Sequence, residues 1–206
     1  MPVIGITGGI ASGKSTVTRL LAENLRNGQA EKVQSFSADE YGHELLENDP
    51  VVRSQIHEQF GNDVIGVDRA LDRARLRQLV FANADRRKAL EAILHPKIHQ
   101  SWRDTAEHFH LKGHYFVAEI PLLYETDSSP YFDCIVVVEA DVQVQLERLS
   151  SKRGWSLETA RRVIEAQMPA EEKTRRANIL ILNHYTEKLL HCQIELAAQA
   201  LLTRYA

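Results

Sequence analysis

The residues from Gly8 to Thr16 carry the clearest chemistry in the sequence, because they fit the phosphate-binding pattern G-x-x-x-x-G-K-[ST]. Glycines at both ends of such a loop let successive backbone N–H groups face one anion, and a helix starting near Lys14 adds its positive dipole end. The ammonium group of Lys14 suits the β and γ phosphates of a nucleotide, and the hydroxyl group of Ser15 suits Mg²⁺. We therefore expect ATP to bind through Gly8, Gly9, Ile10, Ala11, Ser12, Gly13, Lys14, Ser15 and Thr16.

Phosphate-binding loops of this type (P-loops) occur in kinases, GTPases and motor ATPases, so the rest of the sequence has to separate these classes. The chain has no N-K-x-D sequence of the kind that reads guanine in GTPases, and 206 residues are few for a motor with accessory domains. A small phosphotransferase is therefore the favoured class. Three alternatives stay open: a glycine-rich turn that binds nothing, a kinase for another small metabolite such as a nucleotide or sugar acid, and a non-catalytic ATP-binding regulatory module.

Two acidic residues follow apolar runs at positions where open α/β sheets place their ligands. Asp39 comes just after the second run, where a carboxylate can orient or deprotonate an acceptor hydroxyl and contact a metal shell; its alternative role is to cap the helix predicted over Glu40–Glu47. Glu119 ends the third run, where a magnesium-associated acid is often found, and its alternative is an exposed acid at a strand end. Ser15, Asp39 and Glu119 are thus the candidate metal ligands.

Residues 148–176 are locally cationic, with eight basic and four acidic side chains in a chain whose net charge is -3. A basic lid that closes over a nucleotide can neutralise charge on the transferred phosphate and exclude water. Most of these side chains are expected to be solvated. We select Arg148 and Arg153, because a helix that leaves the fourth strand starts beside the phosphate-binding loop.

Five short apolar runs without alternation predict the strands that position these residues. They are Val3–Thr7, Val33–Phe36, Tyr115–Ile120, Cys134–Val138 and Ile179–Leu182. Continuous apolar runs are typical of parallel strands covered by helices on both faces. The fold class is therefore predicted to be α/β, with a five-stranded parallel sheet at the core, a helical substrate-binding insertion and a helical lid.

The core is predicted to comprise residues 1–38, 114–140 and 177–206. Residues 39–113 form the predicted helical lobe, which is longer than a crossover helix needs, with breaks at Asp49-Pro50, Gly61, Gly66 and Pro96. Residues 141–176 form the predicted lid, with Asp141 capping a helix, Gly154 ending it and Pro169 at a first helical position. A surface loop is predicted over Asn24–Lys32. The helical spacing of apolar residues over Thr186–Tyr205 predicts a closing helix packed on the sheet.

The composition excludes several function classes. The chain is 44% hydrophobic and 26% charged, as in ordinary globular proteins, and its charge balance provides no basic field for nucleic acid or an anionic membrane. The two cysteines, Cys134 and Cys192, form no CxxC pair, which argues against disulfide and zinc frameworks and favours a reducing compartment. Nine histidines at scattered spacings suggest no metal triad. Neither a signal peptide nor a membrane span is visible, so we expect a cytoplasmic monomer.

Further segments in chain order resemble the dephospho-coenzyme A kinase family. Besides the phosphate-binding loop they are Ala38-Asp39, Phe60-Gly61, Leu94-His95-Pro96, Pro121-Leu122-Leu123 with Glu125, Gln145–Leu149, Ala166-Gln167-Met168-Pro169 and Asn183. The resemblance covers nearly the whole chain, and the segments after Pro121 are more specific than the loop. It implies a kinase that uses ATP with Mg²⁺ to phosphorylate the ribose 3′-hydroxyl of dephospho-coenzyme A, giving coenzyme A and ADP in the final step of coenzyme A biosynthesis.

The resemblance also implies roles for individual residues. Asp39 and Arg148 would be catalytic together with Lys14 of the loop, and Asn183 would contact ATP together with Arg153, which the cationic segment indicates. The residues implied for substrate binding are Asp39, Phe60, Gly61, His95, Pro96, Leu122 and Glu125. The sequence departs from the family pattern at Ser37, where an acid is usual, and at Asn178, where an acid is favoured. Neither departure touches the three catalytic candidates.

Overall fold

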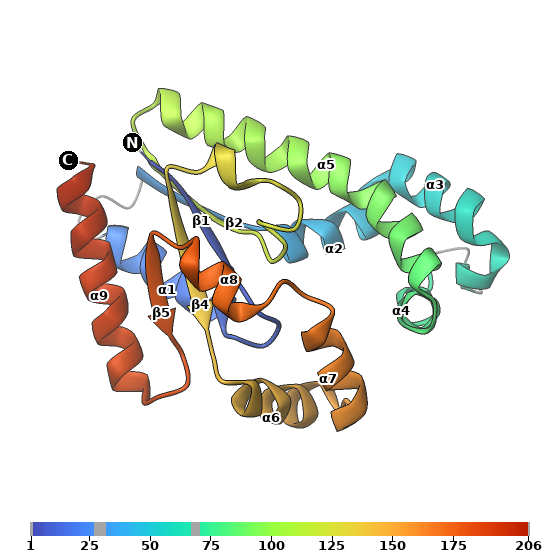
Figure 1. Ribbon diagram of the computed structural model, residues 1–206. Coiled ribbons are helices and arrows are strands. Elements are labelled where there is room, and N and C mark those ends of the chain that lie inside the picture. Colours follow the sequence, from blue (N-terminus) through green and yellow to red (C-terminus); the bar gives the residue numbers. More distant parts are fainter. Residues whose placement is uncertain (1, 27–31, 67–70, 206) are drawn as a thin grey trace. The chain divides into compact units, whose positions relative to one another are not determined.

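The computed structural model describes residues 2–26, 32–66 and 71–205 (Figure 1). Two compact units divide the chain: unit 1 comprises Met1–Ser37 and Thr105–Ala206, and unit 2 comprises Ala38–Asp104. Each unit has its own hydrophobic core.

A five-stranded parallel sheet forms the centre of unit 1, as the apolar runs predict. Its strands are β1 (Val3–Gly8), β2 (Val33–Ser37), β3 (Tyr115–Glu119), β4 (Cys134–Glu139) and β5 (Ile179–Leu182), arranged in the order β2-β3-β1-β4-β5. Because all strands are parallel, their carboxyl ends meet at one edge of the sheet. In the register, Glu119 pairs with Ile6 of β1 and with Ser37 of β2, so these three strand ends are adjacent.

Helices cover both faces of the sheet, which explains why the strands are continuously apolar. On one face, Ile4, Ile6 and Val136 share a core with α1 (Lys14–Arg26) and α9 (Glu187–Arg204), and these two helices pack against each other. On the other face, Phe116 is fully buried and its ring lies 6.3 Å from the ring of Phe109, centroid to centroid. The closing helix packed on the sheet is confirmed.

The segment after β4 contains α6 (Val142–Arg153), α7 (Leu157–Glu165) and α8 (Ala170–Arg175), and a short 3-10 helix, η3 (Ser129–Tyr131), lies between β3 and β4. Gly154 ends α6 in the left-handed conformation, with φ 65°, as predicted. Asp141 precedes α6 as its cap residue, but its side chain makes no capping hydrogen bond. Pro169 precedes α8 instead of starting it, because its ψ of 139° is extended and only its carbonyl oxygen joins the helix, accepting from Glu172 and Lys173.

Unit 2 is helical. It contains α2 (Ala38–Asn48), α3 (Pro50–Phe60), the 3-10 helix η2 (Gly61–Val64), α4 (Arg73–Ala82) and the first part of α5 (Ala84–Leu111). The predicted break at Asp49-Pro50 is confirmed, since the Asp49 carboxylate caps α3 by accepting from two backbone N–H groups. A hydrogen bond from Lys97 to the same carboxylate, at 2.7 Å, lowers the pKa of Asp49.

The predicted break at Pro96 is wrong, because α5 continues through it from Ala84 to Leu111. A proline inside a helix removes one backbone hydrogen bond, but Leu94 and Ile98 on either side of Pro96 pack against the core of unit 2 and hold the helix together. The whole helix lies inside the predicted lobe 39–113, but its residues 105–111 belong to unit 1.

Two other predictions concern segments near the undescribed residues. The predicted loop over Asn24–Lys32 starts too early, since α1 extends to Arg26, and residues 27–31 lie outside the described part of the chain. The break predicted at Gly66 borders residues 67–70, which are likewise not described. In the described ranges, no helix has the length and apolar character that crossing a membrane requires.

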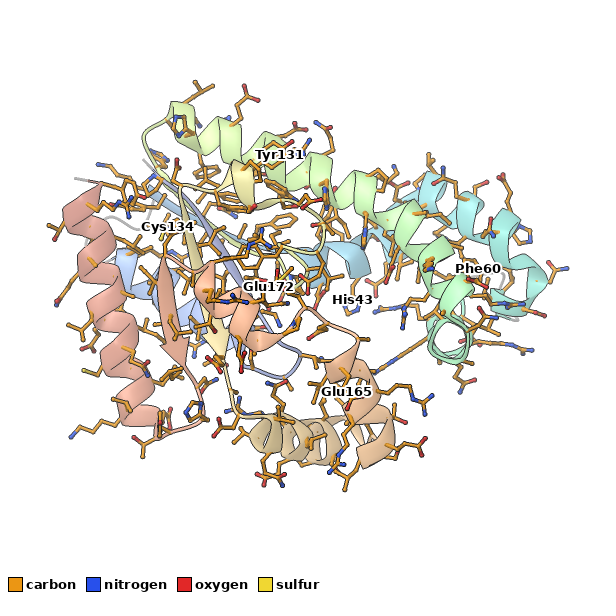
Figure 2. All side chains as sticks on the ribbon, in the orientation of Figure 1. His43, Phe60, Tyr131, Cys134, Glu165 and Glu172 are labelled. Carbon is orange, nitrogen blue, oxygen red and sulfur yellow. The ribbon has the colours of Figure 1, made fainter. Side chains whose placement is uncertain are left out.

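The two cysteines have opposite surroundings. Cys134 starts β4 inside the core of unit 1 (Figure 2), and burial raises the pKa of its thiol to about 11. Cys192 is exposed on α9. Since the thiolate is the reactive form of cysteine, Cys134 is protected by both its protonation and its burial.

A thiol-labelling experiment tests this burial. We expect the native chain to react with one equivalent of an alkylating reagent at pH 8, at Cys192, and the unfolded chain to react with two. Peptide mass spectrometry identifies the labelled residue, and Cys192→Ser serves as the control that leaves only Cys134. Rapid native labelling of Cys134 in that variant would contradict the described packing of β4.

Candidate active site

The phosphate-binding loop connects β1 to α1, and two of its glycines are required by the space around them. Gly8 has φ +149°, and a Cβ atom at this position would lie 2.1 Å from the Val138 carbonyl oxygen. Gly13 has φ +95°, and a Cβ atom there would lie 2.1 Å from Nδ2 of Asn183. A side chain at either position would therefore push the loop away from β4 or from the end of β5.

The carbonyl groups of the loop are held by side chains from two other elements. Arg148, on α6, donates from Nη1 to the carbonyl oxygens of Ala11 (3.1 Å) and Ser12 (3.3 Å), and from Nη2 to that of Asn183 (2.9 Å). The Asn183 side chain donates from Nδ2 to the Ser12 carbonyl at 2.8 Å. The structure thus brings Arg148 and Asn183 to the loop, where their described bonds fix its backbone.

Lys14 lies at the first position of α1 with its side chain folded back over the loop. Its Nζ donates to the carbonyl oxygens of Gly8 (3.2 Å) and Gly9 (3.0 Å), and the residue is only 8% exposed. A buried ammonium group beside the first residues of the loop provides a concentrated positive charge where phosphates would enter.

Ser15 and Glu119 form an oxygen pair at the start of α1. The Ser15 hydroxyl donates to Oε1 of Glu119 at 2.9 Å, and Glu119 is 4% exposed. One hydroxyl and one carboxylate suit Mg²⁺, which takes few protein ligands and completes its shell with phosphates and water. Among the described residues, no cluster of three or more His, Cys, Asp or Glu side chains could hold a metal ion by itself. The pair therefore fits a metal that arrives with a nucleotide.

Asp39 lies in the first turn of α2, at the start of unit 2, and is exposed. It is not the cap of a helix beginning at Glu40, because α2 begins at Ala38. Its place in the chain is two residues after Ser37, which pairs with Glu119 across β2 and β3. The carboxylate of Asp39 is therefore an exposed group in the first turn of α2.

The other residues implied for the substrate are divided between the units. In unit 2, Phe60 is buried in the core (Figure 2) and Gly61 ends α3 with φ 68°. His95 lies on α5 beside Pro96, stacked on His99 with ring centroids 6.1 Å apart, and burial is the main cause that lowers the pKa of His99.

In unit 1, the segment after β3 contains Leu122 and Glu125. Leu122 is half-buried, and its carbonyl oxygen accepts from Thr126. Oε1 of Glu125 lies 2.7 Å from Nζ of Lys173 and accepts from the Met168 N–H at 3.2 Å. The described contacts of Glu125 thus connect it to the segment between α7 and α8.

Arg153, the second arginine selected for the lid, lies at the end of α6. It is exposed, and its guanidinium carbon is 5.5 Å from the centre of the Trp155 ring. Lys173, counted among the cationic side chains, is instead 1% exposed and paired with Glu125. The local positive charge is therefore partly neutralised inside the fold.

Two glutamines that the sequence did not single out contact the loop region. Oε1 of Gln167 accepts from the Ile10 N–H at 2.8 Å. Gln145, which is buried, donates from Nε2 to the Ala140 carbonyl at 2.6 Å and lies beside Gly9; its Oε1 has no hydrogen-bond partner in the part of the chain that the structure describes. Both residues occur in segments that carry the family resemblance, which was the available signal.

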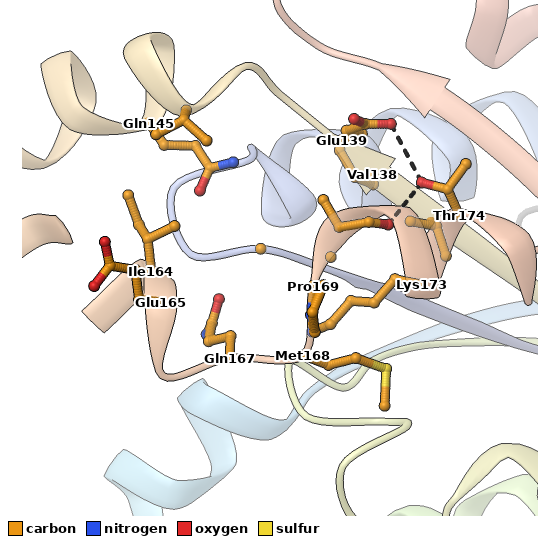
Figure 3. A pocket seen from close by; sticks show the side chains of 15 residues that line it. Val138, Glu139, Gln145, Ile164, Glu165, Gln167, Met168, Pro169, Lys173 and Thr174 are labelled. Carbon is orange, nitrogen blue, oxygen red and sulfur yellow. Dashed lines mark hydrogen bonds between the residues drawn. The ribbon is translucent and has the colours of Figure 1, made fainter. Parts of the chain in front are cut away.

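A cavity of about 290 Å³ lies next to the loop (Figure 3). It is lined by Gly8 and Gly9, by the end of β4, and by side chains of α6, α7, α8 and the segment that joins α7 to α8. Figure 3 shows the side chains of Gln145 and Gln167 beside this space and the hydrogen bond between Thr174 and Glu139. The lining is mostly apolar, and these four residues are among its polar members.

Comparisons with known proteins agree with this geometry. A family model described as dephospho-CoA kinase matches residues 2–188. A dephospho-CoA kinase from Symbiobacterium thermophilum is 40% identical over 202 residues, which cover 97% of this chain and 81% of the relative. One from Methylococcus capsulatus is 37% identical over 183 residues, covering 89% of this chain and 88% of the relative. A crystal structure of a Thermus thermophilus protein has a TM-score of 0.75 at 31% identity, covering 99% of this chain and 97% of that one.

The close approach at Gly13 is tested by comparing it with Gly113, which also has positive φ (+66°) but open space around its Cβ position. We expect Gly113→Ala to lower the free energy of unfolding by about 1–2 kcal/mol, from backbone strain alone. Gly13→Ala should lower it by about 2–4 kcal/mol, because the Asn183 amide must also move and lose its bond to the loop. Denaturant unfolding measures both, and equal losses would contradict the described contact.

Proposed function

Because the chain belongs to the dephospho-CoA kinase family, we propose that it transfers the γ-phosphate of ATP to the ribose 3′-hydroxyl of dephospho-coenzyme A. The products are coenzyme A and ADP, and the reaction is the final step of coenzyme A biosynthesis. The family match over residues 2–188, which includes the complete phosphate-binding loop, is the observation that carries this conclusion. Neither alternative, a kinase for another metabolite or a regulatory ATP-binding module, is favoured by any observation.

Phosphoryl transfer needs positioning and charge stabilisation more than covalent chemistry. In the proposed mechanism the backbone N–H groups of the loop and the start of α1 bind the phosphates of ATP. Lys14 moves its ammonium group from the carbonyls of Gly8 and Gly9 to the β and γ phosphates, where it stabilises charge that shifts during transfer. Asn183 and Arg148 keep the loop in its binding conformation, and Arg153 adds positive charge from the lid.

Ser15 and Glu119 are the residues that would hold Mg²⁺, and their oxygen atoms fit it. Neutralisation of phosphate charge is the chemistry that this ion supplies when it is bound with ATP. Asp39 is a third candidate ligand. To bind the ion, the Ser15 hydroxyl would have to give up its hydrogen bond to Glu119.

We assign the acceptor side of the reaction to Asp39 and the helical lobe 39–113. The carboxylate of Asp39 accepts a hydrogen bond from the ribose 3′-hydroxyl and orients it, or takes its proton as the bond to phosphorus forms. Phe60, Gly61, His95, Pro96, Leu122 and Glu125 complete the proposed substrate-binding set. Residues 141–176 act as a lid over the nucleotide, and a cytoplasmic monomer is the proposed working form.

A turnover assay tests the proposed function directly. The purified chain is incubated with ATP, Mg²⁺ and dephospho-coenzyme A, and the products are identified by mass spectrometry as ADP and coenzyme A. Parallel reactions with nucleoside monophosphates and with sugar acids test the other kinase class. Formation of coenzyme A only with dephospho-coenzyme A supports the proposal; ATP binding without turnover on any acceptor would favour the regulatory module.

Lys14→Ala removes the buried ammonium group from the phosphates. We expect kcat to fall by several orders of magnitude with the fold retained, because the lost charge acts most strongly in the transition state. Lys188→Ala, on the exposed surface of α9, is the matched control and should keep full activity. Normal turnover by a folded Lys14→Ala protein would contradict the proposed role of the phosphate-binding loop in catalysis.

Asp39→Asn keeps the shape of the side chain and removes its charge. We expect kcat to fall by about 10²- to 10⁴-fold with little change in ATP affinity, because the carboxylate acts on the acceptor. Asp63→Asn, another exposed aspartate of unit 2, should change neither. Because Asp39 lies in the first turn of α2, the loss of its charge should lower the free energy of unfolding by no more than about 1 kcal/mol. A strongly destabilised variant with normal kcat would make the role of Asp39 structural.

A further inference from the structure

Gln167 contacts the phosphate-binding loop from the segment between α7 and α8. Its Oε1 accepts from the Ile10 N–H at 2.8 Å, joining positions 157 residues apart in the chain. The backbone N–H of Gln167 itself is satisfied by the Ile164 carbonyl at the end of α7. The side chain therefore has one defined hydrogen bond in the described structure, and that bond is to the loop.

The chemistry of this bond fixes how the amide is oriented. The Ile10 N–H is a donor, so the atom that faces it must be the amide oxygen. The amide nitrogen then lies beside that oxygen in the same plane, with two N–H groups to donate. Gln167 also lines the cavity next to Gly8 and Gly9 (Figure 3), so these donors belong to a side chain that borders the space beside the loop.

The part of the loop that Gln167 contacts is the part that Lys14 marks for the terminal phosphate. Nζ of Lys14 lies at the carbonyls of Gly8 and Gly9, the two residues that precede Ile10. A lysine at this position of the loop pairs with the β and γ phosphates. A donor fixed at Ile10 is accordingly at the γ-phosphate end of the loop.

Glu125 anchors the backbone next to Gln167. The next residue, Met168, donates its N–H to Oε1 of Glu125, and the same oxygen pairs with Nζ of Lys173 at 2.7 Å. The side chain of Lys173 is 1% exposed and that of Glu125 is 22% exposed, so the ammonium end of this ion pair is shielded from water and the carboxylate end still reaches it. Glu125 thus fixes the backbone on the C-terminal side of Gln167, and α7 fixes it on the N-terminal side.

We propose that Gln167 holds Ile10 through its amide oxygen and donates its amide N–H to the terminal phosphate of the bound triphosphate. The inference rests on the proposed function, in which ATP occupies the loop. Gln167 then distinguishes a triphosphate from a diphosphate, and Glu125 and Lys173 are positioning residues that act through it. The side chain is a contact of the transferred group, separate from Lys14.

Binding of ATP and of ADP, each with Mg²⁺, is measured by calorimetry for the wild-type chain, Gln167→Ala, Gln167→Glu and the control Gln199→Ala, an exposed glutamine on α9. We expect Gln167→Ala to weaken ATP binding by about 10-fold or more, as expected for a hydrogen bond to a charged group, and to leave ADP binding within about twofold. The kcat should fall as well. Gln199→Ala should change none of these values.

Gln167→Glu separates the two parts of the proposal. A carboxylate can still accept from the Ile10 N–H, but it has no N–H to donate and adds negative charge beside the phosphate. We expect it to weaken ATP binding more than Gln167→Ala does. If the glutamate restores the wild-type preference for ATP over ADP and normal kcat, Gln167 only supports the loop and the proposal fails.

Glu125→Gln tests the anchor. Its effect on the ratio of ATP to ADP affinity should disappear when it is combined with Gln167→Ala, because both changes act on one contact. If the effects of Glu125→Gln and Gln167→Ala on this ratio are additive, Glu125 does not act through Gln167. An inactive wild-type chain would overturn the proposed function, whereas the ATP and ADP affinities would still decide the role of Gln167. If the ratio of ATP to ADP affinity is unchanged in folded Gln167→Ala and Gln167→Glu, the proposed role of Gln167 is overturned.

Discussion

A loop that turns its backbone N–H groups toward an anion turns its carbonyl groups the other way, and those carbonyls also need partners. In this chain the carbonyls of Ala11 and Ser12 are satisfied by Arg148 and by the Asn183 side chain, and Arg148 also bonds the Asn183 carbonyl. Much of the architecture follows from this requirement. The helix after β4 must start beside the loop to bring Arg148 there, and β5 must end close enough for Asn183 to reach Ser12.

The same arrangement changes how the charge of the lid segment is understood. Counting residues gives 148–176 a surplus of four positive charges, but several of these charges already have partners. Lys173 is paired with Glu125, and the guanidinium carbon of Arg176 lies 4.2 Å from the centre of the Tyr124 ring. The guanidinium group of Arg148 donates hydrogen bonds to the carbonyl groups of the loop. A phosphate in the loop is therefore met mainly by charges that the fold has fixed in advance, which is the condition under which electrostatic stabilisation costs least reorganisation.

The sequence predicts best what depends on local pattern. All five strands could be predicted because each is a short apolar run, and the loop could be predicted because its glycines and Lys14 stand at fixed spacing. Pro96 shows the limit: its local effect is to break a helix, yet packing of its neighbours against the core of unit 2 keeps α5 continuous. The contact of Gln167 with Ile10 has no local signature at all, since it depends on where α7 and α8 lie against the sheet.

Three consecutive residues of the loop are held from different directions. The Ile10 N–H is bound by Gln167, the Ala11 carbonyl by Arg148 and the Ser12 carbonyl by Arg148 and Asn183. Arg148 lies on α6, and Gln167 lies between α7 and α8. Both side chains contact the loop backbone that presents N–H donors to phosphate. A displacement of α6 or of the segment between α7 and α8 would therefore change the loop, because each partner that moves would take a backbone group with it or leave that group unsatisfied. If residues 141–176 close as the proposed lid, their closure must also change the shape of the phosphate site.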